Sequence, residues 1–298
     1  MPEHTARNTA ATSTRDEESA RTAAGIAQLA DLLAAGPAAL LTGAGVSTDS
    51  GIPDYRGAGA PVRSPMRFQE FVADPDYRRR YWAGARLGAG SFDRIGPNAG
   101  HREIARLERT GFLTGVITQN VDGLHRAGGA HRLVELHGNG ASIRCLDCGT
   151  RYARSAVLSW IDRDNPWLAT DEAITINPDG DAETSNYRDL VLPECPNCGG
   201  TLRPDVVFFG EFVPTETFAA AGEIVDEAAL LIVAGSSLAV NSGIRLVERA
   251  ARAGKPLAII NRGPTKADAR AAIRIESGTS EAFAALVDAL LRRESPRP

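Results

Sequence analysis

Ala38-Ala39-Leu40-Leu41-Thr42-Gly43-Ala44-Gly45 is the stretch that decides the fold, because an apolar run leads directly into a glycine-rich turn. The run predicts a buried strand over 38–42. Glycines placed directly after a strand let the backbone approach a pyrophosphate and donate N–H groups to it. The pattern is not a complete G-x-G-x-x-G, since the next glycine is Gly51, and a plain tight turn would explain it equally well. No lysine followed by serine or threonine completes a P-loop, which argues against ATP hydrolysis.

Outward from this stretch, apolar runs alternate with helical patterns. We expect helices over 25–35, 99–110, 242–253 and 280–291, and further strands over 115–118, 133–136, 229–234 and 256–260. Alternation of this kind indicates an α/β fold with a parallel, Rossmann-like sheet covered on both faces. The polar and glycine-rich segments follow the strands, and ligands of open α/β sheets bind at that edge.

Two stretches interrupt the alternation. Residues 60–98 contain prolines and aromatic residues, and residues 142–204 contain all four cysteines. We expect these two insertions to form a small helical and zinc-binding domain. The Rossmann-like domain then comprises 25–59, 99–141 and 205–292. Residues 1–24 are mostly Ala, Thr, Ser, Arg and acidic residues without an apolar stretch and predict a disordered N-terminal tail, and 293–298 predict a C-terminal tail.

Composition excludes several classes of function. The 298 residues carry a net charge of −4 without a basic stripe, which argues against a nucleic-acid partner. No apolar run is long enough to span a membrane, and residues 1–24 do not form a secretory signal. Positive charge is almost entirely arginine, a bias of GC-rich genomes. We therefore expect a cytoplasmic protein of bacterial type, with no membrane partner.

The four cysteines form two pairs, Cys145-x-x-Cys148 and Cys195-x-x-Cys198. A two-residue gap lets both thiolates of a pair bind one metal ion. Four thiolates complete a tetrahedron and leave no position for water or substrate, so the spacing predicts one structural zinc ion. Two disulfides or a redox pair are the alternatives, and the lack of an export signal disfavours them.

Polar groups follow two further strands. Gln119, Asn120 and Asp122 form a dense polar tip after one strand and could hold ribose hydroxyls and a carboxamide, or simply cap the strand end. His137 follows the next strand. A histidine of near-neutral pKa can accept a proton from a hydroxyl, although a lone histidine is more often structural.

Over roughly residues 25–292 the chain resembles the sirtuin family, the NAD-dependent protein deacylases. The motifs that carry the resemblance lie at 43–56, 118–125, 135–138, 204–211, 235–238 and 261–263, together with both cysteine pairs. Within the family, 77–82 and 178–181 resemble the class II branch.

The resemblance implies a reaction and its site residues. The amide oxygen of an acyl-lysine attacks C1′ of the nicotinamide ribose, nicotinamide leaves, and His137 acts as general base so that the 2′-hydroxyl takes the acyl group. The products are deacylated lysine and 2′-O-acyl-ADP-ribose. NAD is a co-substrate, and the partners are acylated-lysine proteins or peptides. The implied catalytic residues are His137, Asn120 and Asp122.

The same resemblance assigns the binding residues. Those implied for NAD are Gly43, Ala44, Gly45, Ser47, Asp54, Tyr55, Arg56, Gln119, Asn120, Asp122, His137, Gly235, Ser236, Ser237, Asn261, Arg262, Gly263 and Thr279. Those implied for the substrate are Val207, Phe208, Gly210 and Glu211, with the backbone of 207–211 pairing with the peptide as an added strand.

One departure concerns the acyl group. Desuccinylating sirtuins carry a Tyr-x-x-Arg pair that holds the acyl carboxylate, whereas this chain has Tyr81-Trp82-Ala83-Gly84. We therefore predict poor activity on succinyl-lysine and leave acetyl, lipoyl and longer apolar groups open.

Other functions remain as alternatives. The same chemistry allows delipoylation or mono-ADP-ribosyl transfer to a protein. A non-enzymatic NAD- or ADP-ribose-binding module is a further hypothesis, and the presence of His137, Asn120 and Asp122 argues against it. A zinc-based DNA-binding regulator is the weakest alternative, because the net charge is negative.

Overall fold

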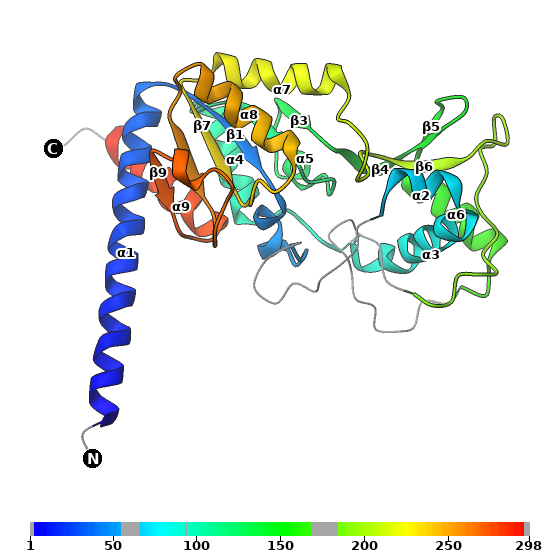
Figure 1. The fold of residues 1–298 in the computed structure, drawn as a ribbon, viewed down its shortest axis with the longest axis horizontal. Helices are drawn as coiled ribbons and strands as arrows, with labels where there is room; N and C mark the ends of the chain where they lie inside the picture. The colour runs from blue at the N-terminus through cyan, green and yellow to red at the C-terminus, as the bar shows by residue number, and fades with distance from the viewer. Residues whose placement is uncertain (1–2, 55–65, 93, 169–183, 295–298) are drawn as a thin grey trace.

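The computed structural model of the protein describes residues 3–54, 66–92, 94–168 and 184–294. Its large domain is built on a six-stranded sheet with the order β3-β2-β1-β7-β8-β9, and every neighbouring pair is parallel (Figure 1). The strands are β1 (Ala38–Thr42), β2 (Leu113–Thr118), β3 (Leu133–Glu135), β7 (Leu230–Ala234), β8 (Leu257–Ile260) and β9 (Ile273–Ile275). This is the strand order of doubly wound nucleotide-binding sheets, and it confirms the predicted Rossmann-like fold class.

Helices cover both faces of this sheet. One face packs against α1 (Glu3–Ala35), α4 (Ala99–Arg109) and α9 (Thr279–Glu294), and the other against α7 (Thr215–Glu227) and α8 (Asn241–Arg252). β1 and β7 are buried along their whole length, which is why each is a continuous apolar run rather than an alternating one. Side chains such as Leu29 and Phe283 are completely buried, and each such burial stabilises the fold by about 2 kcal/mol.

The helix predicted over 99–110 forms as α4. The Asn98 side chain caps it by accepting a hydrogen bond from the His101 N–H at 3.1 Å. His101 in turn faces the Asn98 N–H through its ring Nδ1 at 3.3 Å. The reciprocal arrangement is a capping box, which fixes the start of the helix where the sequence predicted it.

The N-terminal segment differs from its prediction. The helix expected over 25–35 is the end of α1, which begins at Glu3 and so includes most of the segment predicted to be a disordered tail. Ala, Glu and Arg are abundant in this segment and have high helix propensity, so a helix extends without an apolar face to bury. Among the α1 side chains whose burial is described, those in the core are Ile26, Leu29, Ala30 and Leu33, and the N-terminal end of the helix lies away from the rest of the molecule (Figure 1).

The small domain joins helices to a three-stranded antiparallel sheet of order β5-β4-β6. Its elements are α2 (Phe68–Ala73), α3 (Pro75–Phe92), β4 (Gly138–Cys145), β5 (Arg151–Ala153), α6 (Arg154–Asp164) and β6 (Leu202–Val206). Phe71, Tyr81, Trp82 and Phe208 form an aromatic cluster in its core. β4 begins directly after His137, and the predicted boundaries at 141/142 and 204/205 fall inside β4 and β6.

The remaining elements are short. They are η1 (Ala44–Val46), η2 (Thr48–Ser50), α5 (Leu124–Ala127) and η3 (Asp268–Arg270). Within the described ranges, no helix combines the length and apolar character needed to cross a membrane.

Candidate active site

A cavity of about 980 Å³ lies where the carboxyl ends of the large sheet face the small domain. The strand order reverses between β1 and β7, which places the cavity at the point where open α/β sheets bind ligands. Most of the residues predicted from the sequence line it. They are Gly43, Ala44, Gly45, Ser47, Asp54, Gln119, Asn120, Asp122, His137, Val207, Phe208, Gly235, Ser236, Ser237, Asn261, Arg262, Gly263 and Thr279.

The turns that follow β1 and β7 touch each other through glycines. A Cβ on Gly45 would lie 2.8 Å from the Gly235 Cα, and a Cβ on Gly235 would lie 2.6 Å from the Val46 nitrogen. Gly235 also has a φ of +60°, which L side chains rarely adopt. The glycines therefore let the two turns pack directly against each other, and a side chain at either position would push them apart.

The N–H groups of the first turn are used differently from the prediction. Gly43 N donates to the Ala234 carbonyl at 3.1 Å, and Gly45 N donates to the Gly235 carbonyl at 2.9 Å. These two donors join the strand ends instead of pointing at a phosphate. Gly43 and Gly45 would then help to bind a diphosphate by letting it lie close to the backbone. Their role as ligand-binding residues stays a prediction.

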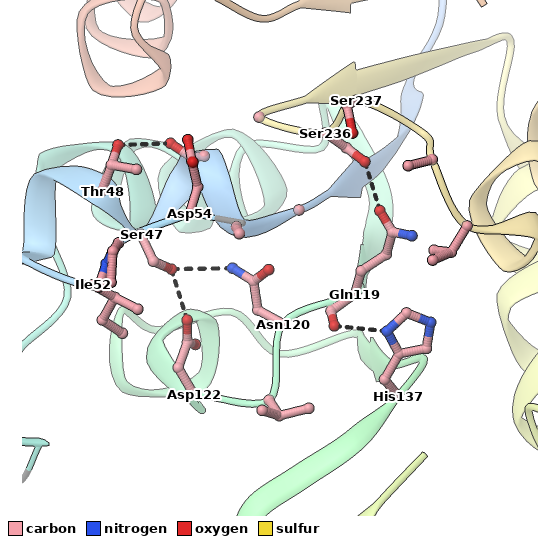
Figure 2. Close-up of a pocket in the computed structure, with 18 of the residues that line it drawn as sticks. Ser47, Thr48, Ile52, Asp54, Gln119, Asn120, Asp122, His137, Ser236 and Ser237 are labelled. Atoms are coloured by element: carbon pink, nitrogen blue, oxygen red, sulfur yellow. Dashed lines mark hydrogen bonds between the residues drawn. The ribbon is translucent and has the colours of Figure 1, made fainter. Parts of the chain in front are cut away.

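A polar cluster connects the first turn to the tip of β2. Ser47 Oγ donates to Asp122 Oδ2 at 2.7 Å and accepts from Asn120 Nδ2 at 3.0 Å (Figure 2). The second carboxylate oxygen, Asp122 Oδ1, accepts from the Leu124 N–H at 2.9 Å at the start of α5. These bonds hold an amide and a carboxylate at fixed positions on the cavity wall.

Further along the same edge, polar groups that follow β7 and β8 line the cavity. Ser236 Oγ donates to Gln119 Oε1 at 2.6 Å (Figure 2). Asn261 uses its side-chain amide to hold the turn after β8, donating to the Arg262 carbonyl at 2.8 Å and to the Gly263 carbonyl at 3.0 Å. Thr279 Oγ1 reaches the Gly45 carbonyl at 3.3 Å, so the start of α9 closes this end of the cavity.

His137 is oriented by two hydrogen bonds. Its Nδ1 lies 2.9 Å from the Gln119 carbonyl, which can only accept, so Nδ1 carries the proton (Figure 2). Nε2 is therefore the acceptor nitrogen, and the Ser242 hydroxyl, 2.9 Å away at the start of α8, donates to it. Burial lowers the pKa of His137 below its ordinary 6.5, while the Gln119 carbonyl opposes this shift. The imidazole is thus neutral and basic at pH 7.

Two other histidines lie buried close to this wall. His125 Nε2 is 2.8 Å from Thr42 Oγ1, and its ring packs edge-on against His101 with centroids 4.8 Å apart. Burial lowers the pKa of His125 to about 3 and that of His101 to about 4. His101 Nε2 and His125 Nδ1 have no hydrogen-bond partner within the described part of the chain. Both rings are neutral and act as packing groups that support Thr42 and the β2 tip.

The predicted substrate segment is shaped by a buried arginine. Arg203 is 1% exposed and donates to both carboxylate oxygens of Glu211, at 2.7 and 2.6 Å. It also donates to the Val206 carbonyl at 2.5 Å, and its guanidinium lies over the Phe208 ring at 4.8 Å. Phe208 N donates to Glu211 Oε2, which closes the turn. Val207 and Phe208 line the cavity, whereas Gly210 and Glu211 are not among its lining residues.

The four cysteines come together at the far end of the small-domain sheet. Their Sγ atoms all lie within 4.8 Å of one another, with Cys145–Cys198 at 3.6 Å and Cys148–Cys195 at 3.7 Å. A tetrahedral zinc ion with Zn–S bonds of about 2.3 Å requires sulfur atoms about 3.8 Å apart. None of the four is part of a disulfide in the structure, which disfavours the disulfide alternative. The group fits one zinc ion with no position left for substrate, so its role is structural.

Some predicted residues cannot be placed, and some functional residues were missed. Tyr55, Arg56 and the class II segment 178–181 lie outside the described residues. Ser242, Arg203 and Arg154 were not predicted. Ser242 and Arg154 contact segments that are distant in the sequence, so no local motif signals them. Arg203 instead donates to Pro204, Val206 and Glu211, within or beside the motif at 204–211.

The sequence of this chain is similar to those of known proteins. A family model described as Sir2 family matches residues 43–242. The chain is 46% identical over 275 residues to NAD-dependent protein deacetylase 1 of Mycobacterium avium, covering 91% of this chain and 96% of that protein. It is 47% identical to NAD-dependent protein deacetylase 1 of Streptomyces coelicolor, covering 89% and 90%. NAD-dependent protein deacylase SIR4 of Batrachochytrium dendrobatidis is 44% identical, covering 82% and 87%.

Solved structures show the same fold. The structure described as Sir2-p53 peptide-NAD+ superposes with a TM-score of 0.70 at 31% identity and covers 87% of this chain and 95% of that one. A Sir2 homologue in complex with ADP ribose gives a TM-score of 0.71 at 28% identity, with coverage of 91% and 98%.

Proposed function

Because the chain belongs to the Sir2 family, we propose that it is an NAD-dependent protein lysine deacylase that releases nicotinamide and 2′-O-acyl-ADP-ribose. Relatives that it matches over most of their length carry the name NAD-dependent protein deacetylase or deacylase. The observation that carries the proposal is His137. Its Nε2 is an acceptor, on a cavity wall shared with the Asn120–Asp122 cluster and the Gly45–Gly235 contact.

The residues that line the cavity support NAD as its ligand. The close packing of Gly45 on Gly235 supports a diphosphate site at these two turns, and Ser236, Asn261 and Arg262 line the side that would receive the adenosine half. Asn120 and Asp122 offer an amide and a carboxylate for the nicotinamide ribose and its carboxamide. The site is therefore divided into a polar nucleotide half and, around Phe208, an apolar half for the acyl-lysine.

The proposed reaction consumes NAD as a substrate. The acyl-amide oxygen bonds to C1′ as the C1′–N bond to nicotinamide breaks, and nicotinamide leaves with the bonding electrons. His137 Nε2 then takes the proton of a ribose hydroxyl, so that this oxygen attacks the acyl carbon. The bond from the acyl carbon to the lysine nitrogen breaks, and the amine leaves with a proton. One water molecule then adds to the acyl group that bridges the two ribose oxygens, which gives 2′-O-acyl-ADP-ribose. The Ser242 hydroxyl holds Nε2 until the ribose hydroxyl replaces it. Apolar side chains such as Phe208 exclude water, which would otherwise hydrolyse the activated sugar.

The zinc ion would be held by Cys145, Cys148, Cys195 and Cys198 and would supply no catalysis, since four thiolates complete its coordination. It would fix the distal end of the β4–β6 sheet. The same strands carry the domain junction at His137 and the substrate segment after Val206. Free thiols at such a site suit a reducing compartment, and we propose the cytoplasm of a bacterial cell.

Product analysis tests the proposal. Wild type and His137→Ala are incubated with acetylated peptides with and without NAD, and the products are identified by mass spectrometry. We expect deacetylated peptide and acetyl-ADP-ribose from the wild type only, while the variant still binds NAD. ADP-ribose attached to the protein or peptide would indicate a transferase instead. Equal inactivity of both proteins against every acyl-lysine peptide would favour a binding module.

A further inference from the structure

The cavity has a cationic side chain at its small-domain end. Among the described residues that line it, the arginines are Arg262 and Arg154. Arg262 follows β8 beside Asn261, on the side assigned to the adenosine half. Arg154 is the first residue of α6, in the small domain, and is half-buried. The two guanidinium groups therefore belong to opposite halves of the cavity.

Contacts place the Arg154 guanidinium between α3 and β4. Its Nη2 donates to the Ala85 carbonyl at 3.1 Å, and a Cβ built on Gly140 would lie 3.8 Å from its Nη1. Gly140 is bonded through its N–H to the Val121 carbonyl at 2.8 Å, and both residues line the cavity. Arg154 therefore lies beside the segment that carries Asn120 and Asp122, on the side that faces α3.

The Arg154 guanidinium lies next to Gly84, the position of α3 at which desuccinylating sirtuins carry an arginine. The sequence lacks an arginine three residues after Tyr81, and that absence predicted poor activity on acyl groups with a carboxylate. Ala85, whose carbonyl Arg154 contacts, is the residue next to Gly84. Tyr81 lies one helical turn earlier on α3 and also lines the cavity, with its ring edge-on to Phe208 at 6.4 Å. A guanidinium from α6 thus lies against the turn of α3 that contains Gly84 and lines the same cavity as Tyr81.

We propose that Arg154 is a specificity-determining residue that binds the terminal carboxylate of an acidic acyl group, so that the enzyme accepts succinyl- or glutaryl-lysine. The inference rests on the proposed deacylase function and names its substrate class. Apolar neighbours such as Val206 and Phe208 disfavour a carboxylate unless a cation compensates it. An arginine does so with paired N–H donors that match the two carboxylate oxygens. This proposal replaces the prediction of poor succinyl activity, which rested on the missing arginine of α3.

Matched acyl pairs test this proposal. Succinyl- is compared with butyryl-lysine, and glutaryl- with pentanoyl-lysine, in one peptide sequence with acetyl-lysine as reference. Each pair differs by a carboxylate in place of a methyl group. The proteins are wild type, Arg154→Gln, Arg154→Lys, and Arg163→Gln as control. Arg163 lies on the same helix but is exposed and paired with Asp164. Zinc content and melting temperature report folding.

We expect the wild type to cleave at least one acidic acyl group with a kcat/KM no lower than that of its apolar match. Arg154→Gln should lower kcat/KM for the acidic group about 10- to 100-fold, the usual range for a lost charged hydrogen bond. Acetyl and apolar groups should change less than about threefold, Arg154→Lys should recover part of the loss, and Arg163→Gln should match the wild type. Cleavage of acetyl-lysine with no cleavage of either acidic group, or an equal loss on all acyl groups in Arg154→Gln, would overturn the inference.

A binding measurement separates this inference from the proposed function. Fluorescence anisotropy of labelled glutaryl- and pentanoyl-lysine peptides reports recognition without turnover. Even if no acyl group were cleaved, Arg154-dependent preference for the glutaryl peptide would support the site, and equal binding of both peptides would overturn it. Failure of all NAD-dependent turnover, in contrast, would count against the deacylase function itself.

Discussion

Replacing Arg203 by methionine should strongly destabilise the small domain. Arg203 is almost completely buried and donates to Glu211 and to the carbonyl groups of Pro204 and Val206. Methionine keeps the apolar stem but removes every donor. The Glu211 side chain, 19% exposed, then keeps its charge with only the Phe208 N–H as a recorded partner. Breaking a buried pair from one side costs about 3–5 kcal/mol, and we expect a loss near 4 kcal/mol.

Tryptophan fluorescence during urea unfolding is suited to this measurement. All three tryptophans, Trp82, Trp160 and Trp167, lie in the small domain or directly after α6, so the signal reports the domain that contains Arg203. The control is Arg151→Met. Arg151 is an exposed partner of Asp205 on the same sheet, and its loss should cost less than about 1 kcal/mol.

A double variant tests the cause. Glu211→Gln keeps an acceptor for the Phe208 N–H but removes the stranded charge, so Arg203→Met/Glu211→Gln should be more stable than Arg203→Met alone. KM for an acetylated peptide should rise in Arg203→Met, because the turn that follows Val206 loses its support. Equal stability of Arg203→Met and Arg151→Met would refute the reasoning.

Three further predictions concern other parts of the molecule. Gly235→Ala should weaken NAD binding at least about tenfold by calorimetry, because its Cβ would collide with the backbone of Val46. The control is Gly254→Ala, because Gly254 has a similar φ of +70° but nothing near its Cβ position, and this variant should bind NAD as the wild type does. Equal NAD affinities of the two variants would contradict a diphosphate site at the Gly45–Gly235 contact. The free energy of unfolding should fall by about 3 kcal/mol from pH 7 to pH 5, because the unfolded chain binds protons below pH 6.5 whereas folded His101 and His125 stay neutral to about pH 4 and 3. A flat profile in urea titrations at both pH values, or ring NMR signals of these histidines that titrate near 6.5, would show that the two rings are not held neutral. Chelation of the zinc ion should change small-domain tryptophan fluorescence and abolish turnover. Unchanged fluorescence and activity after measured zinc loss would exclude a structural metal.

The large sheet was predictable because its strands are buried on both faces. Such strands are continuous apolar runs, and the run over 38–42 corresponds residue for residue to β1. β9 escaped prediction because it has only three residues, with the polar Arg274 at its centre, which is too short for a periodic signal. The extent of α1 was missed because polarity argued for disorder where helix propensity favoured a helix.

The site residues likewise divide into those that the sequence predicted and those that it did not. Glycines and polar residues that directly follow strands were found, since strand ends meet at one edge of the sheet. Their partners were not found. Ser242 meets His137 across 105 positions, and Arg154 meets Ala85 across 69. Such contacts depend on how helices pack against a sheet, which no local pattern encodes. Gly43 and Gly45 were found as a motif, but the sequence did not show that their N–H groups donate to the carbonyl groups of Ala234 and Gly235.

The most direct test of the central claim is the stoichiometry of nicotinamide release. Purified protein is given NAD with an acetyl-lysine peptide or with the same peptide unacetylated, and nicotinamide and deacetylated peptide are quantified together. We predict that nicotinamide is released at an appreciable rate only with the acetylated peptide, with one nicotinamide formed for each acetyl group removed. Release at the same rate with the unacetylated peptide, or deacetylation without nicotinamide release, would contradict the account.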